Sequence, residues 1–370
     1  MTQGISVVIP THNRLEYLKE AVGSVLHQEG DWSLTVVMDA CTDGTAAWLK
    51  ELSDPRVSAV ALESGSERSA ARNRGLDDAK GGLVVFLDDD DHLAPKGLIR
   101  LEAALDQHEE AVAAVGAMMH FNDKGQKRRS DFPRRFRVLD MADQVMFGFP
   151  ASPGSTMFRT RLLRDLGGWP MERDVGRVIP HEDQYLWFRV AEKGPIALIP
   201  EIVLEYRRHV AQWRPPDTYA LERKLREDFI ATLPQNRRQR AEVVLRARLL
   251  HERGVLAWWR NDVPEARRCF FEMVRSDRGL ITSPFVGKRV RSLLVRSVVG
   301  TMFGSRITAW LQHLVWTLRK LLGRAPGVEP LLPSVTAPPG SSEGHPTGGY
   351  EARPVGTAET PGTAEPSGRD

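Results

Sequence analysis

Residues 83–91 read LVVFLDDDD, an uninterrupted apolar run that passes directly into four aspartates. A short apolar run of this kind is typical of a strand that is buried on both faces. Such a strand would deliver the carboxylates of Asp88 to Asp91 together at its carboxyl end. Because carboxylates repel one another, the cluster indicates a site for a hard divalent cation, which takes oxygen ligands and shares them with phosphates. The alternative is a solvated acidic turn.

Three more strand-like runs precede this stretch, and helix-like segments alternate with them. The strand-like runs are residues 5–9, 34–38 and 57–62, and the helix-like segments are residues 15–26, 46–52 and 69–79. This alternation predicts an α/β fold with a mainly parallel central sheet covered by helices on both faces. Ligands of such sheets bind beyond the carboxyl ends of the strands, where Pro10, Asp39 and Asp88 fall.

The C-terminal part of the chain has a different composition, with many Arg, Leu and Ala residues. Helical spacing predicts a helical domain at residues 216–285, in which residues 254–274 form either a tetratricopeptide-like helix pair or an ordinary helical hairpin. Residues 286–325 are basic and amphipathic, so they either lie on an anionic membrane surface or pack on the protein's own core. Residues 326–370 are rich in Pro, Gly, Ser and Thr, and we expect a disordered tail.

Composition restricts the possible partners of the chain. Its 370 residues include 51 basic and 48 acidic ones, and a net charge of +3 is too small to indicate nucleic-acid binding. The two cysteines, Cys41 and Cys269, are too isolated for a disulfide framework or a zinc site. We find no secretory signal and no apolar stretch of about 20 residues, so we expect a cytoplasmic protein, either soluble or peripheral on the inner face of the membrane.

Five motifs occur in an order that resembles the family 2 glycosyltransferases, whose nucleotide-binding half has the GT-A fold. They are ISVVIPTHNR at 5–14, MDACTDGT at 38–45, ARNRG at 71–75, LDDDD at 87–91, and HED at 181–183 followed by LWFR at 186–189. The resemblance covers roughly residues 5–210 and implies a GT-A nucleotide-diphospho-sugar transferase domain at residues 1–215.

The resemblance implies a role for each motif residue. The nucleotide pocket would be lined by Pro10, Thr11, His12, Arg14, Asp39, Arg72, Asp88 and Asp89. Asp39 would hold uracil or another base. The ligands of a Mn²⁺ or Mg²⁺ ion would be Asp88, Asp90, Asp91 and His209, although His209 also reads as an ordinary surface histidine. The catalytic pair would be Glu182 and Asp183, with Asp183 as the base.

These roles predict an inverting, metal-dependent glycosyltransferase that takes a sugar from a nucleotide diphosphate, and a UDP-sugar is the favoured donor. The acceptor would be a glycan or a lipid-linked molecule in surface polysaccharide or glycolipid synthesis. One alternative is a catalytically inactive nucleotide-sugar-binding or scaffold protein, against which the intact Asp88, Asp90 and Asp183 count. The other is a sugar nucleotidyltransferase. That enzyme would need a glycine-rich loop after the first strand, and residues 10–14 contain no glycine.

Overall fold

The computed structural model describes most of the chain as far as residue 279. The described residues are 4–63, 68–130, 132, 135–139, 151–171, 182–209, 218–259, 262–279 and 295. His181 and the predicted tail lie outside them, as does the predicted basic segment apart from Val295.

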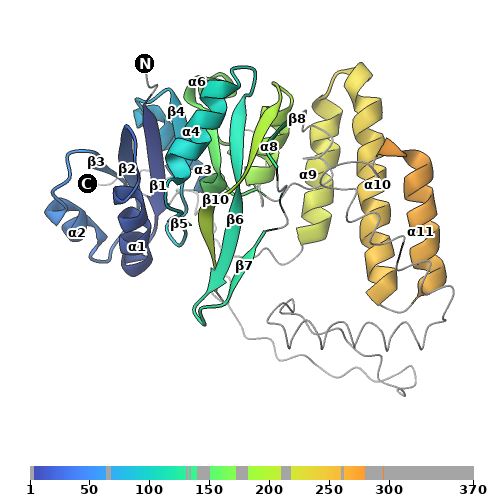
Figure 1. The fold of residues 1–370 in the computed structure, drawn as a ribbon, viewed down its shortest axis with the longest axis horizontal. Coiled ribbons are helices and arrows are strands. Elements are labelled where there is room, and N and C mark those ends of the chain that lie inside the picture. Colours follow the sequence, from blue (N-terminus) through green and yellow to red (C-terminus); the bar gives the residue numbers. More distant parts are fainter. Residues whose placement is uncertain are drawn as a thin grey trace, which may run out of the picture. The chain divides into compact units, whose positions relative to one another are not determined.

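Ten strands of the described residues form one mixed sheet (Figure 1). They are β1 (Ile5–Thr11), β2 (Trp32–Asp39), β3 (Val57–Leu62), β4 (Leu83–Phe86), β5 (His92–Leu93), β6 (Ala113–Asn122), β7 (Lys127–Arg129), β8 (Arg137–Leu139), β9 (Thr156–Arg159) and β10 (Ile196–Arg208). Their order is β3-β2-β1-β4-β9-β6-β10-β5, with β7 beside β6 and β8 beside β10. β1 to β4 are parallel, as predicted. The sheet becomes mixed at β9, which lies antiparallel between β4 and β6.

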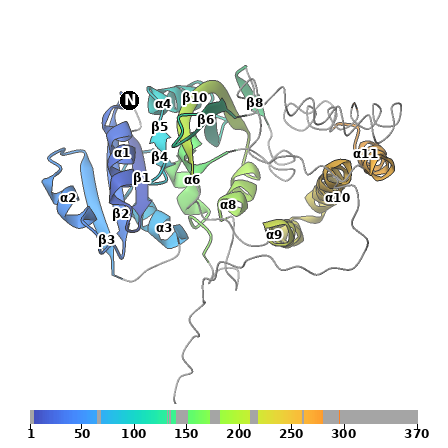
Figure 2. The same ribbon diagram turned by 90° about the horizontal axis from the view of Figure 1, so that it is seen from below.

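Helices cover both faces of the sheet. They are α1 (Leu15–Leu26), α2 (Thr45–Glu51), α3 (Arg68–Asp78), α4 (Gly97–Gln107), α6 (Thr160–Asp165) and α8 (Glu182–Ala191). Figure 2 shows α1 and α4 on one face and α3 and α8 on the other. Alternate residues of β1 therefore enter different cores: Val7 and Ile9 pack with the side of α1, and Val8 packs with the side of α3.

The close approach of α3 to β1 depends on Gly75. A Cβ atom at this position would lie 2.2 Å from Cγ1 of Val8, so only glycine allows the helix to pack this closely. Arg72 lies about one turn earlier on α3 and is buried at the ends of the strands. The third sequence motif thus serves packing through Gly75 and presents Arg72 to the site.

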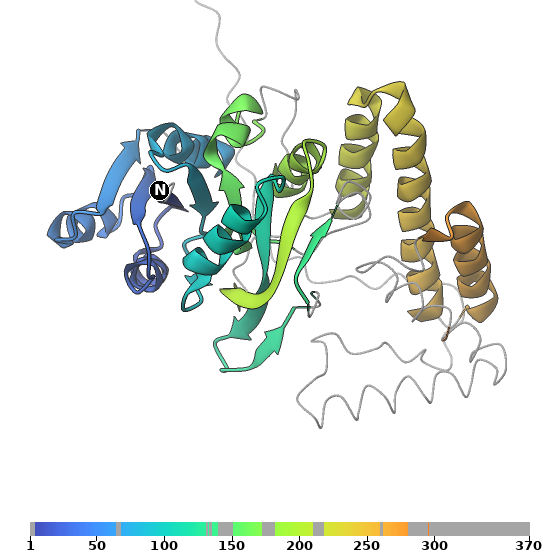
Figure 3. The same ribbon diagram turned by 45° about the horizontal axis from the view of Figure 1, so that its top comes forward.

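Three helices occupy the region that the sequence predicts to be helical: α9 (Thr218–Thr232), α10 (Gln235–Trp259) and α11 (Val263–Ser276). α10 and α11 form a hairpin that is seen side by side in Figure 3. α9 joins this region to the sheet domain, because Phe229 packs on Phe188 of α8 with ring centroids 5.1 Å apart. The tetratricopeptide-like assignment stays a prediction. Among the described helices, none combines the length and hydropathy of a membrane span.

Candidate active site

A pocket of about 380 Å³ lies at the carboxyl ends of β1, β2 and β4. It is lined by Pro10, Thr11, His12, Arg14, Asp39, Arg68, Ala71, Arg72, Asp88, Asp89, Asp90 and Tyr206. The structure therefore brings together all eight residues that the resemblance implies for the nucleotide pocket, while their binding of a nucleotide stays a prediction. Sequence reasoning missed Arg68 and Tyr206. Arg68 precedes the quoted third motif by three residues. Tyr206 belongs to a strand, and the local sequence does not indicate which face of the sheet its side chain occupies.

The loops after β1 and β2 are connected to each other at the rim of this pocket. Asn13 and Ala40 adopt left-handed backbone conformations, with φ of 53° and 48°. The Asn13 side-chain oxygen accepts hydrogen bonds from the backbone amides of Thr42 at 2.7 Å and Asp43 at 3.2 Å. His12 Nδ1 lies 2.5 Å from the carbonyl oxygen of Asp39. The second motif is thereby held beside the first, with Asp39 in the pocket wall.

Asp89 connects the acidic turn to β1. Its carboxylate accepts a hydrogen bond from Thr11 Oγ1 at 2.8 Å and one from Arg14 Nη1 at 3.2 Å. Burial and, to a smaller extent, the neighbouring Asp90 and Asp88 raise the pKa of Asp89 to about 6, although Arg14 and Thr11 act in the opposite direction. Asp89 therefore positions the turn against the first motif.

Asp90 connects the same turn to the end of β10. Its Oδ2 atom lies 3.0 Å from Arg14 Nη1 and 3.0 Å from Nε2 of His209. The His209 side chain is 3% exposed, and its ring lies 5.4 Å from that of Tyr17. His209 is thus a buried neighbour of the acidic turn and not a surface histidine.

The donor set of this turn suits a hard divalent cation. Within the described part of the chain, one oxygen each of Asp88 and Asp90 accepts no hydrogen bond, and Nδ1 of His209 is buried without a partner. The described residues contain no group of three or more His, Cys, Asp or Glu side chains arranged round a single metal position. The oxygens of Asp88 and Asp90 that accept no hydrogen bond fit an ion that would take one or two carboxylates from the protein and its remaining oxygens from a bound diphosphate, and the binding of Mn²⁺ or Mg²⁺ stays a prediction.

Asp91, a predicted metal ligand, is not brought to the pocket. It is fully buried, and its Oδ1 atom accepts a hydrogen bond of 2.8 Å from the backbone amide of Arg207. Burial and the three neighbouring aspartates raise the pKa of Asp91 well above its ordinary value. Its carboxyl group therefore serves the interior of the protein.

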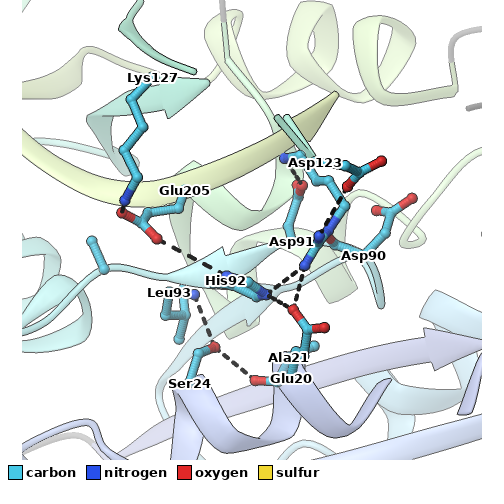
Figure 4. A network of polar contacts seen from close by, with 12 residues as sticks. Glu20, Ala21, Ser24, Asp90, Asp91, His92, Leu93, Asp123, Lys127 and Glu205 are labelled. Atoms are coloured by element: carbon cyan, nitrogen blue, oxygen red, sulfur yellow. Dashed lines mark hydrogen bonds and ion pairs between the residues drawn. The ribbon is translucent and has the colours of Figure 1, made fainter. Parts of the chain in front are cut away.

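Arg207 is a third residue that sequence reasoning missed. The Arg207 guanidinium pairs with Glu20 and lies 3.5 Å from Asp123. Figure 4 shows this network of polar contacts, in which Glu20, His92, Asp91 and Asp123 are labelled. The Nε atom of Arg207 donates to the carbonyl oxygen of Asp90 at 3.0 Å. Arg207 of β10, which is paired with Glu20 of α1, thus holds the backbone of the acidic turn. The local sequence, two adjacent arginines, does not indicate which of them points inward.

Arg72 joins the acidic turn to the predicted catalytic pair. Its Nη2 atom lies 2.7 Å from Oδ1 of Asp88, and its Nη1 atom lies 2.8 Å from Oε1 of Glu182. The side chain is 4% exposed, and its guanidinium lies 4.4 Å from the centre of the Trp169 ring. Burial lowers the pKa of Arg72, but the two carboxylates outweigh this effect and raise it above its ordinary value. The stretches near residues 90 and 183 therefore converge.

Asp183 follows Glu182 in the first turn of α8. Burial and, to a smaller extent, the charge of Glu182 raise the pKa of Asp183 to about 7, although Arg72 acts in the opposite direction. A carboxyl group with such a pKa can accept or release a proton near neutral pH. Asp183 is not among the residues that line the pocket. Its neighbour Glu182 connects it to the pocket, because Glu182 accepts a hydrogen bond from the pocket residue Arg72.

Residues 6–167 match the family model for glycosyl transferase family 2. An uncharacterized protein of Mycobacterium tuberculosis is 28% identical over 221 residues, which are 56% of this chain and 67% of that protein. The putative teichuronic acid biosynthesis glycosyltransferase TuaG of Bacillus subtilis is 40% identical over 90 residues, which are 24% of this chain and 36% of that protein. The chain thus spans only about a third of the length of this second relative.

The fold is similar to that of a solved structure, residues 1–349 of S. aureus TarS in complex with UDP-GlcNAc. The TM-score is 0.56, and the match covers 83% of this chain and 88% of that one at 19% sequence identity. At this identity the likeness concerns the fold alone. It confirms the expected GT-A architecture.

Proposed function

Because residues 6–167 of this chain form a family 2 glycosyltransferase domain with the GT-A fold, we propose that the protein is an inverting transferase that uses a nucleotide-diphosphate sugar. The observation that carries the proposal is the position of Arg72. It joins Asp88 at the pocket to Glu182, the neighbour of Asp183, so an acidic turn and a carboxyl base lie at one site.

In the proposed reaction, the oxygen of an acceptor hydroxyl attacks the anomeric carbon of the donor sugar. The bond from that oxygen to the anomeric carbon forms while the bond from this carbon to the diphosphate oxygen breaks, so the configuration inverts. The hydroxyl proton passes to the carboxylate of Asp183, whose raised pKa suits a base near neutral pH. Such general-base help contributes a factor of about 10² to 10⁴ in rate.

The donor would lie in the pocket, with its base at Asp39 and its diphosphate at the acidic turn. Asp88, Asp90 and His209 are the residues that would hold Mn²⁺ or Mg²⁺ there. The bound ion supplies Lewis-acid stabilisation of the charge on the leaving diphosphate. A UDP-sugar is the donor that we favour, since the TarS structure of similar fold contains UDP-GlcNAc.

The acceptor is proposed to be a polysaccharide or glycolipid intermediate. TuaG, which matches this chain over part of its length, is named for teichuronic acid biosynthesis. The basic segment 286–325 lies outside the described residues apart from Val295, and its contact with the inner face of a membrane remains a proposal from the sequence. The paired site at Arg72 disfavours the alternative of an inactive scaffold.

A panel of nucleotide sugars tests the proposal by thermal stabilisation and by slow donor hydrolysis, each with Mn²⁺ and with a chelator. We expect Asp183→Asn to keep nucleotide binding and lose turnover, and Asp90→Asn to weaken Mn²⁺-dependent nucleotide binding as well. Asp165→Asn, a change at a carboxylate that is 69% exposed on α6, is the matched control. If Asp183→Asn turned over at the wild-type rate, Asp183 would not be the base.

A further inference from the structure

Four side chains of β6, β7 and β10 form one row on a single face of the sheet. Arg128 of β7 lies opposite His120 of β6, and His120 lies opposite Tyr206 of β10. Residues in register share a face, and Arg208, two residues beyond Tyr206, points the same way. The Arg208 guanidinium lies 5.1 Å from the Tyr206 ring, and its Nε atom is 3.4 Å from Nδ1 of His120. We call Arg128, His120, Tyr206 and Arg208 the cationic face.

The charge on this face is not balanced. Arg128 and Arg208 are exposed, and within the described part of the chain neither forms an ion pair with a carboxylate. Burial, together with the charges of Arg208 and Arg128, lowers the pKa of His120 to about 4, so this histidine is neutral at pH 7 and experiences a positive field.

The opposite face of the same strands shows the contrast. There Lys127 lies 3.0 Å from Glu205, and Arg207 pairs with Glu20 and Asp123. Arg129, a third cation on that face, donates to the carbonyl oxygens of Phe132 and Pro200. The cations of that face are therefore engaged by carboxylates or by carbonyl oxygens. The excess is confined to the face that carries Tyr206.

Tyr206 connects the cationic face to the chemistry, because it lines the pocket together with Asp88 and Asp90. An acceptor that reaches the sugar of the donor would therefore extend past Tyr206 toward Arg208 and Arg128. β6 lies between the strands of Arg128 and Arg208. Arginine side chains on one face of a sheet can each direct a fork of N–H donors at an oxyanion. A phosphate, with three terminal oxygens, can accept from two such forks, whereas the two oxygens of a carboxylate are matched by one.

We propose that the cationic face is an acceptor subsite that binds a phosphate group of the acceptor. The inference rests on the proposed transferase function and narrows its substrate class. Arg128 and Arg208 would bind an anion outside the donor pocket. The Tyr206 side chain would separate this anion from the carboxylates of the acidic turn.

The test follows the imidazole signals of His120 by NMR in the full-length protein with ¹³C-labelled histidine. Inorganic phosphate is titrated at constant ionic strength in the presence of UDP and Mg²⁺, which occupy the donor pocket. We expect a saturable shift of the His120 signal in the wild type. Arg128→Gln and Arg208→Gln should each weaken phosphate binding by roughly tenfold, since each removes a charge-assisted contact. Lys127→Gln, a change on the balanced opposite face of the same hairpin, should leave it unchanged.

Other outcomes overturn the inference. No saturable shift in the wild type removes the subsite, and an equal response to acetate would reassign it to a carboxylate. UDP binding is measured separately by calorimetry on all variants. If the two arginine variants lost UDP affinity instead, the face would belong to the donor diphosphate. If the wild type bound neither UDP nor any nucleotide sugar of the panel, the proposed function itself would fail.

Discussion

Arg72→Met removes the guanidinium that joins Asp88 to Glu182 while keeping an unbranched apolar stem beside Trp169. We expect this change to destabilise the folded state by about 2 to 4 kcal/mol at pH 7, because it leaves two carboxylates facing one another without a cation. Its effect should be largest on the sheet domain, where Arg72 connects α3 to the turn after β4 and to α8.

The magnitude follows from the burial of the three partners. Removing one partner of a buried ion pair costs about 3 to 5 kcal/mol, and Arg72 is 4% exposed. Glu182 is 13% exposed, but Asp88 is 31% exposed and can regain part of its hydration, which reduces the cost. Loss of the contact with the Trp169 ring adds about 0.5 to 1 kcal/mol.

Urea unfolding followed by tryptophan fluorescence measures this cost, with far-ultraviolet circular dichroism as a second probe. Arg74→Met is the matched control, because Arg74 lies on the same helix, is 43% exposed and pairs with Asp78 at 3.1 Å, a surface pair worth at most about 1 kcal/mol. In an Asp88→Asn background the cost of Arg72→Met should fall, since one of the two stranded charges is already absent. Equal losses for Arg72→Met and Arg74→Met would refute this account of the site.

Two further predictions concern stability. The folded-state pKa of Asp183 is about 7, above its ordinary value of 3.8, so the contribution of its protonated form to folding stability is complete below pH 3.8 and is lost as the pH rises through 7. Asp183→Asn should therefore raise the thermal midpoint at pH 8 and raise it less at pH 5. A gain in thermal midpoint that grew toward pH 5 would contradict this. Gly75→Ala should lower the free energy of unfolding, measured in urea, by about 1 to 3 kcal/mol because the new methyl group would meet Val8. Gly23→Ala on α1, where a Cβ meets nothing within 4 Å, should be neutral or stabilising. Similar losses of stability at both positions would disprove the packing argument.

The first half of the fold could be predicted because its signals are local. The spacing of apolar residues predicts a helix at residues 15–26 and a strand at residues 57–62, and α1 and β3 have these bounds. The strand predicted at residues 83–87 is one residue shorter, since β4 ends at Phe86. Such segments are read correctly because their period follows directly from burial against neighbouring elements.

The second half of the sheet could not be predicted in the same way. β9 lies between β4 and β6 and pairs antiparallel with both, although about 70 residues separate it from β4 in the chain. β5 has only two residues, His92 and Leu93, and pairs with β10. Pairing between strands this distant or this short depends on tertiary contacts, which a local apolar pattern does not record.

The four aspartates show why the sequence predicts the position of the site better than the role of each residue in it. Asp88 is held by Arg72 of α3, Asp89 by Thr11 and Arg14, Asp90 by Arg14 and His209, and Asp91 by the Arg207 amide of β10. Every carboxylate thus meets at least one donor from another element of the fold, and Asp89 and Asp90 share Arg14. These donors offset the repulsion among the four aspartates. The motif alone cannot indicate which carboxylate faces inward, because that direction is decided by donors on elements up to 119 residues away.

The same division of contacts explains how one turn can serve both structure and chemistry. Asp91 is held inside the protein and does not line the pocket, so it fixes the path of the backbone. Asp88, Asp89 and Asp90 all line the pocket, and Asp89 is also held by Thr11 and Arg14. Arg14 contacts both Asp89 and Asp90, so a divalent cation that bound Asp90 would compete with this guanidinium for the carboxylate. Metal affinity at the proposed site is therefore coupled to Arg14 in the loop after β1, and this loop directly follows Pro10 and Thr11 at the pocket end of the strand.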